Sequence, residues 1–250
     1  MPRVGCMIAG GVVAAVLAGC AASTPAGQTG AGIPRSPAIA TPAAASSARG
    51  RAAADWDIDG DGRRDRARLV YLGGYGPDNW ELVVNMTTLG QRTVRFTGDP
   101  VLPGNTGAPT IAGSVDADRT GHAEIFVKVS SGASTQFWTI FTLAGRQIRQ
   151  VTVKGQPVRL AVGGTLTHQG GFRCDGGQLV TVNEGTELPG YTKWIYQRDT
   201  YAWSGAGLVL LSKRTGQVTS SRPGSPPAAY SGVSCGDLPQ YAPLYTASPS

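Results

Sequence analysis

The sequence predicts an all-β domain that follows a secretion signal and a flexible linker. Three observations favour strands: the chain beyond Asp55 is rich in Val, Thr, Trp, Tyr and Gly, it holds no sustained helical period, and short apolar runs alternate with polar residues. In the run 80–86 every second residue is apolar, while Glu81 and Asn85 fall on the opposite face. The domain is therefore expected to be built from short strands joined by glycine turns.

Residues 1–19 are predicted to form a bacterial lipoprotein signal peptide. Arg3 precedes an apolar run over 7–18 that is too short to span a membrane. The run ends in L-A-G-C at 17–20, which resembles the lipobox of bacterial lipoproteins. The resemblance implies that Cys20 carries lipid and holds the protein on the extracytoplasmic face of the cell membrane. The alternative is an ordinary secretory signal that leaves Cys20 as a free thiol.

The segment 20–54 is predicted to be a disordered linker. It consists almost entirely of Ala, Ser, Thr, Pro and Gly, a composition that cannot bury a core. What remains, 55–250, is one domain's worth of chain and ends in a segment rich in Pro and Ser. The sequence thus predicts a domain held at a distance from a membrane surface.

The domain divides into three similar units, at about 55–110, 111–170 and 171–215. In the first two, a strand, a glycine-containing loop and a second strand lead to a tight turn, centred on Gly90 and Gly145, and then to a third strand. The third unit follows the same order more loosely. The alternative is a chance similarity between β-hairpins.

An acidic loop precedes each of the first two units. The loops are D-I-D-G-D-G-R-R-D over 57–65 and D-A-D-R-T-G-H-A-E over 116–124, with glycine at the sixth position of both. Alternate side chains of such a loop converge, and their oxygens suit calcium better than magnesium. The alternative is a pair of solvated turns, or surface ion pairing with neighbouring arginines. The predicted metal residues are Asp57, Asp59, Asp61, Asp65, Asp116, Asp118, Thr120 and Glu124, with Arg63 and His122 contributing backbone carbonyls only.

The loops are not EF-hands, because their twelfth positions are Arg68 and Val127 and strands follow them directly. The pattern D-x-D-x-D-G-x-x-D before an apolar strand resembles the FG-GAP repeat of integrin α-subunits and the related bacterial VCBS-type repeats. The resemblance implies propeller-like blades with calcium loops and no enzymatic chemistry. Three units are too few to close a propeller, which predicts a partial or open one. The third unit offers only C-D-G-G at 174–177, where no metal is expected.

If Cys20 is lipidated, Cys174 and Cys235 remain as an even pair in an oxidising compartment, and a disulfide between them is expected. It would tie the C-terminal segment back onto the domain. The alternative is a pair of buried free thiols.

The sequence holds no recognised catalytic motif, and its only histidines are His122 and His168. We expect a calcium-stabilised binding or structural module of the cell envelope. The alternative is an envelope hydrolase that uses scattered carboxylates, for which Glu184, Glu187 and Asp199 are the candidates.

The net charge of +6 suggests an anionic wall polymer or an envelope protein as partner, while nucleic acid is not expected outside the cell. Four aromatic residues of the third unit form either a binding face or part of the core. They are Trp194, Tyr196, Tyr201 and Trp203.

Overall fold

The computed structural model describes residues 56–101, 107–165, 167–186, 192–221 and 232–240. Within these ranges the chain forms strands and turns and no helix, which confirms the all-β prediction. It follows that no helix there is long and apolar enough to cross a membrane. The predicted signal peptide, Cys20, the linker and Glu187 lie outside the described residues.

The described part of the chain contains fifteen strands. They are β1 (Arg66–Tyr71), β2 (Trp80–Met86), β3 (Gly90–Phe96), β4 (Thr110–Val115), β5 (Glu124–Ser131), β6 (Thr135–Ala144), β7 (Gln147–Gln150), β8 (Thr152–Val153), β9 (Gln156–Pro157), β10 (Leu160–Gly164), β11 (His168–Asp175), β12 (Gln178–Gly185), β13 (Lys193–Ser204), β14 (Gly207–Thr219) and β15 (Gly232–Ser234).

The first unit is a sheet of its own, in which β1, β2 and β3 pair antiparallel in chain order. The alternation expected in β2 is present: Trp80, Leu82, Val84 and Met86 are all buried on one face. Gly90, at φ 72°, opens β3 directly after the turn, a backbone conformation that favours glycine.

The second and third units share one sheet. Its hydrogen-bonded order is β4-β5-β6-β10-β11-β12-β13-β14-β8-β9, with β7 added beside β6 and β15 beside β11. The long strand β6 makes this possible, because β7 pairs with its end at 141–144 and β10 with its start at 135–138. The two units are therefore joined by backbone hydrogen bonds, and the sheets are open rather than closed.

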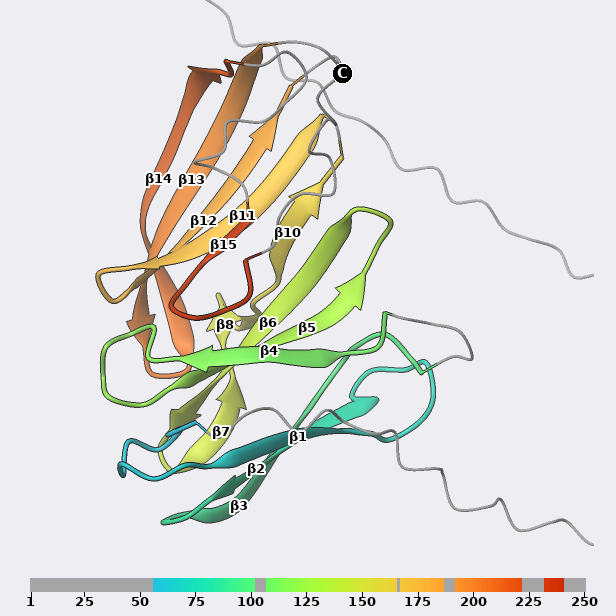
Figure 1. The fold of residues 1–250 in the computed structure, drawn as a ribbon, viewed down its shortest axis with the longest axis vertical. Coiled ribbons are helices and arrows are strands. Elements are labelled where there is room, and N and C mark those ends of the chain that lie inside the picture. Colours follow the sequence, from blue (N-terminus) through green and yellow to red (C-terminus); the bar gives the residue numbers. More distant parts are fainter. Residues whose placement is uncertain (1–55, 102–106, 166, 187–191, 222–231, 241–250) are drawn as a thin grey trace, which may run out of the picture. The chain divides into compact units, whose positions relative to one another are not determined.

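The strands β5 and β6 form a middle layer with apolar side chains on both faces. Ile125 and Val127 pack toward the first unit, in a core with Leu82 and Phe96. Phe126 belongs instead to a second core, shared with β10, β11 and β12. Burial on both faces explains the continuous apolar run at the start of β5. Figure 1 shows this order of layers, with β1–β3 at the bottom and β10–β14 at the top.

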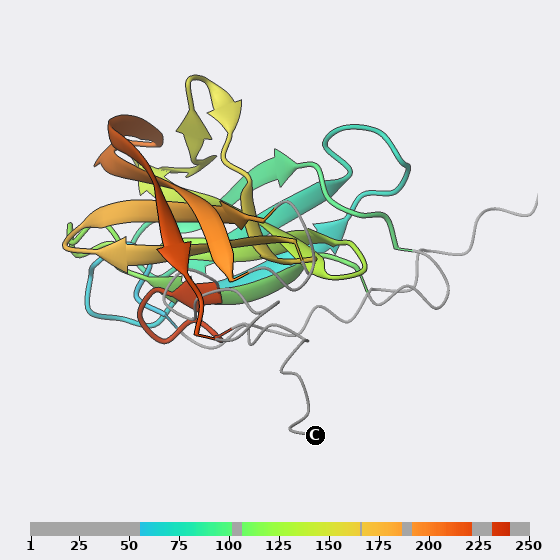
Figure 2. The same cartoon turned by 90° about the horizontal axis from the view of Figure 1, so that it is seen from above.

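In the large sheet, the strand order from β10 to β14 continues into the short strands β8 and β9. Gly207 and Leu208, at the start of β14, pair in parallel with Thr152 and Val153 of β8. β8 forms a hairpin with β9, and only two residues separate β9 from β10. The order of the sheet therefore ends on a hairpin that lies close to β10 in sequence and is not paired with it. Figure 2 shows the β8–β9 hairpin beside the bent end of β14.

The structure brings together the two cysteines of the predicted disulfide. Cys174 at the end of β11 and Cys235 after β15 are bonded, and their Cα atoms lie 4.7 Å apart. β15 runs parallel to β11 over residues 171–173, next to the bond. The disulfide therefore fixes a C-terminal strand to the third unit.

Candidate metal centres

The two acidic loops are held by the same hydrogen bonds. In the first, the Gly62 N–H donates to Asp57 Oδ2 (2.8 Å) and the Asp61 N–H to Asp59 Oδ1 (3.4 Å). Each loop therefore turns its first and third carboxylates toward its own backbone.

In the second loop, the Gly121 N–H donates to Asp116 Oδ2 (3.1 Å) and the Thr120 N–H to Asp118 Oδ1 (2.9 Å). As in the first loop, the sixth residue donates to the first and the fifth residue donates to the third. The shared spacing thus produces a shared backbone structure.

The acid at the ninth position closes each loop from inside. Asp65 is 1% exposed and accepts the Ile58 N–H at 2.9 Å, while Glu124 is fully buried and accepts the Ala117 N–H at 2.8 Å. In both loops the donor is the second residue, whose apolar side chain is buried. The ninth carboxylates thus anchor the loops to the cores beneath them.

Both loops have a left-handed backbone at their fourth and sixth positions. Gly60 and Gly62 have φ values of 73° and 80°, and Arg119 and Gly121 have 62° and 88°. Two such residues turn the chain tightly enough to bring alternate side chains together. Arg119 is the exception in residue type, because a side chain disfavours this conformation.

Carboxylate oxygens gather in each loop. One ligand oxygen from each of Asp57, Asp59 and Asp61 lies within 4.8 Å of the others, and Asp116, Asp118 and Glu124 form the equivalent group. Such groups have the composition of a divalent cation site.

In the first loop, Asp59 Oδ2 is buried and has no hydrogen-bond partner. Burial, and then the charges of Asp65 and Asp61, raise the pKa of Asp59. The Thr88 hydroxyl, which donates to Asp61, holds the pKa of that exposed carboxyl below its ordinary value. The carboxylates of one loop thus have different environments.

In the second loop, burial and then the charge of Asp118 raise the pKa of Glu124 to about 7. The hydrogen bonds from the Ala117 N–H and the Thr142 hydroxyl oppose this rise without overcoming it. A positive charge beside Glu124 would favour its carboxylate form.

The loops lie next to one another. A Cβ atom on Gly60 would stand 2.6 Å from the Gly121 carbonyl oxygen and 2.9 Å from the His122 ring. A Cβ atom on Gly177, in the turn between β11 and β12, would stand 3.2 Å from the Asp118 carbonyl oxygen, so this turn lies against the second loop. In Figure 1 the three loops follow one another along the left edge, coloured blue, green and orange.

His122, predicted to contribute only its backbone, faces the first loop. With Asp59, Asp61 and Thr88 it lines a hollow of about 230 Å³ to which the β6–β7 turn adds Arg146. The first centre is therefore bounded by residues of the second unit.

Of the other predicted residues, Asp65 lies outside the three-oxygen group of the first loop, because both of its oxygens accept backbone N–H groups, those of Ile58 and Thr87. Thr120 and Arg63 take part through their backbone N–H groups, which donate to Asp118 and Asp61.

Sequence reasoning missed the threonines that contact these acids. Thr87 and Thr142 each stand three residues before the turn glycine of their unit. The Thr87 backbone N–H donates to Asp65, and the Thr142 hydroxyl donates to Glu124. Aligning the units on Gly90 and Gly145 would have found them.

No protein-family model, curated protein or solved structure matches the chain.

The geometry separates the carboxylates of the predicted hydrolase. Glu184 lies opposite Tyr196, and Asp199 lies opposite Thr181, in one unbroken register. Since residues 196 and 199 differ by an odd number, their side chains stand on opposite faces of the sheet. Glu184 and Asp199 therefore cannot act on one bond.

The aromatic residues also divide between the two faces. Trp194 is fully buried and shares a face with Tyr196, while Tyr201 and Trp203 lie on the other face and pack against the second core. A single aromatic binding face made of all four is not formed.

Proposed function

We propose that this protein is a cation-stabilised binding or structural module of the bacterial cell envelope, with calcium in its two acidic loops. The observation that carries the proposal is the repetition of one backbone framework around two groups of three carboxylates. Carboxylates this close repel one another unless a cation lies between them. Calcium suits them because it accepts irregular cages of oxygen ligands.

The proposed arrangement places the domain outside the membrane, tethered through lipid on Cys20 and the linker 20–54. The three units are proposed to be propeller-type repeats of which the second and third have merged into one sheet. The row of three adjacent loops supports this, because equivalent loops of neighbouring blades lie at the same end of such an array. An anionic wall polymer or an envelope protein is the proposed partner.

Calcium titration tests the cation proposal. Calcium at about a hundred times its Kd should stabilise the folded state by about 2.7 kcal/mol for each loop that binds it, or about 5 to 10 °C in Tm per loop for a domain of this size. Differential scanning calorimetry with and without chelator measures the shift. Asp59→Ala should remove the first loop's part of the shift, because Asp59 supplies a carboxylate to the first group only.

Asp78→Ala is the matched control, since Asp78 is exposed and lies outside both loops. It should keep the full calcium shift. A wild-type Tm that does not change between calcium and chelator would overturn the proposal.

A further inference from the structure

The outer edge of β14 has no strand beside it over most of its length. On one side β14 pairs with β13, but on the other side only Gly207 and Leu208 meet a strand, the short β8. Since β14 has thirteen residues, the edge over 209–219 is left without a strand in the described part of the chain (Figure 1). Its backbone makes no hydrogen bond there to a residue outside the β13–β14 hairpin. Such a row of unpaired N–H and C=O groups is a template for another strand.

Three adjacent aliphatic residues of this edge are exposed. Val209 is 55% exposed, Leu210 43% and Leu211 54%. The register with β13 shifts between Thr200 and Tyr201, so Leu211 has no partner on β13 and β14 bulges at this point. A run of exposed apolar residues on a strand is avoided in soluble domains unless it serves a contact. The edge therefore offers apolar side chains as well as backbone groups to a partner.

Two exposed basic residues, Lys213 and Arg214, follow this run. Arg214 lies directly opposite Arg198 of β13, so the two side chains share one face of the hairpin. Like charges directly opposite one another destabilise a strand pair. The pairs on either side of them on that face are uncharged, Tyr196 with Gly216 and Thr200 with Ser212. A carboxylate placed beside Arg198 and Arg214 would relieve the repulsion.

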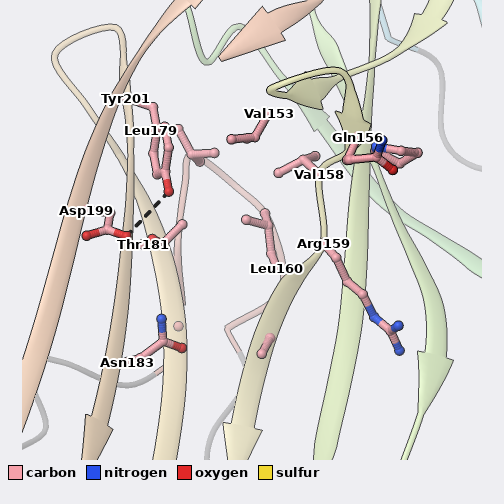
Figure 3. A pocket seen from close by; sticks show the side chains of 13 residues that line it. Val153, Gln156, Val158, Arg159, Leu160, Leu179, Thr181, Asn183, Asp199 and Tyr201 are labelled. Atoms are coloured by element: carbon pink, nitrogen blue, oxygen red, sulfur yellow. Dashed lines mark hydrogen bonds between the residues drawn. The ribbon is translucent and has the colours of Figure 1, made fainter. Parts of the chain in front are cut away.

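Lys213 is also without an acidic partner. It lies opposite Asp199 in the register, but Asp199 accepts the Tyr201 hydroxyl at 3.5 Å (Figure 3) and the Gln197 amide at 2.9 Å. No ion pair joins Lys213 or Arg214 to an acid among the described residues. The edge thus carries positive charge that the domain itself does not pair.

The combination of these features selects one kind of partner. Lysine and a bulge on an edge strand serve to prevent pairing, but here they leave three aliphatic residues exposed and repel only a basic strand. A second copy of this chain would bring a second Lys213 and Arg214 to the edge. An anionic polysaccharide or polyphosphate has no row of backbone N–H groups to pair with β14. An extended acidic polypeptide fits the backbone, the apolar residues and the charge together.

We propose that β14 binds an extended acidic segment of a partner protein, which adds a strand to the sheet at 209–219. In this mode of binding, main-chain hydrogen bonds supply affinity and side chains supply specificity. Apolar residues of the segment would lie against 209–211, and its carboxylates against Lys213 and Arg214. The inference rests on the proposed role as a binding module, but it uses no residue of the acidic loops, so it and the calcium proposal can fail separately.

Three acetylated and amidated peptides test the inference on the full chain. They are T-V-E-V-E-V-T, the basic T-V-K-V-K-V-T, and T-V-E-P-E-V-T, which keeps the acids and replaces the central valine by proline. Binding is followed by amide-resolved NMR at β14. The first peptide should bind at 209–219 at least about tenfold more tightly than the proline peptide, because proline removes a donor from the ladder and does not fit a paired strand. The basic peptide should not bind.

Reversing the charge of the edge should reverse this preference. Lys213→Glu combined with Arg214→Glu should bind the basic peptide and lose the acidic one. Arg68→Glu combined with Arg95→Glu is the matched control, because both residues are exposed on the other sheet and the change in net charge is the same. It should keep the acidic preference. Val209→Ser combined with Leu211→Ser changes no charge and should weaken binding of the acidic peptide.

Four results would overturn the inference. Equal binding of the two acidic peptides would show charge attraction without strand pairing. Binding of sodium polyphosphate at β14 without binding of any peptide would assign the edge to a polyanion. A dimer held through β14, measured by analytical ultracentrifugation of the wild type without peptide, would make a second copy the occupant. The absence of binding by all probes would leave the edge without a partner of this class.

Discussion

At the scale of single residues, the two ninth-position acids show how a buried carboxylate shapes a loop, and Glu124 also belongs to a three-oxygen group while Asp65 does not. Asp65 and Glu124 are buried and accept backbone N–H groups within their loops. Asp65 also accepts the Thr87 N–H, and Glu124 accepts the Thr142 hydroxyl. A carboxylate in this position holds the loop in shape before any ion arrives. The spacing predicted these acids as ligands, but only the structure shows their role in closing the loops.

Gly60 and Gly62 provide a matched pair of substitutions. Both have a left-handed backbone, so Gly62→Ala should cost about 1 to 2 kcal/mol of unfolding free energy from strain alone. Gly60→Ala should cost about 1 to 3 kcal/mol more, because its Cβ would collide with the Gly121 carbonyl, whereas nothing lies within 4 Å at Gly62. Urea denaturation in chelator measures both without a contribution from bound cation. If Gly60→Ala and Gly62→Ala lost the same unfolding free energy, the close contact between Gly60 and Gly121 would not contribute to stability.

Glu184 predicts a pH dependence. It is 3% exposed, its carboxylate has no hydrogen-bond partner, and burial raises its pKa from 4.5 to about 7. Because the folded state holds the proton more tightly, the stability that it contributes is complete below pH 4.5 and is lost as the pH rises through 7. Between pH 4.5 and pH 7, the free energy of unfolding of the wild type should fall by about 2 to 3 kcal/mol more than that of Glu184→Gln, which has no carboxyl group at this position.

Urea denaturation at a series of pH values measures this difference for the two proteins. Asp237→Asn, at an exposed carboxyl, should follow the wild-type profile. Parallel profiles for wild type and Glu184→Gln would contradict the assignment.

At the scale of elements, the strands were the most predictable part of the molecule. The apolar alternation of 80–86 and the runs at 125–129, 179–182 and 208–214 all lie in strands. The short strands β8, β9 and β15 were not predicted, because two or three residues carry no period. Their positions depend on tertiary pairing with β14 and β11, which a local pattern does not contain.

The disulfide is the element-scale feature most open to test. Replacing both Cys174 and Cys235 with serine should lower the free energy of unfolding by about 2 to 4 kcal/mol, because the bond restricts a long loop of the unfolded chain. Denaturation with and without dithiothreitol measures this. The reductant should lower the stability of the wild type and leave the double variant unchanged; a loss of similar size in both proteins would assign the effect to something other than the bond.

At the scale of the whole molecule, the sequence predicted three units, and the structure arranges the strands in two sheets. Local similarity suggested three separate blades, yet the length of β6 allows β10 to extend the second unit into the third. The pocket of about 290 Å³ that Figure 3 shows was also unforeseeable, because its lining comes from residues 153 to 201, which strand pairing brings together.

The pairing of β8 with β14 also makes the large sheet depend on chain order. Both acidic loops precede β8 in the chain, but the large sheet beneath the second loop continues through β10 to β14, and β8 and β9 have no strand to lie against until Gly207 and Leu208 are present. A chain that stopped before Gly207 would keep every carboxylate of the loops and lose the parallel partner of β8. Residues that follow both loops are therefore needed to complete the sheet on which the second loop stands.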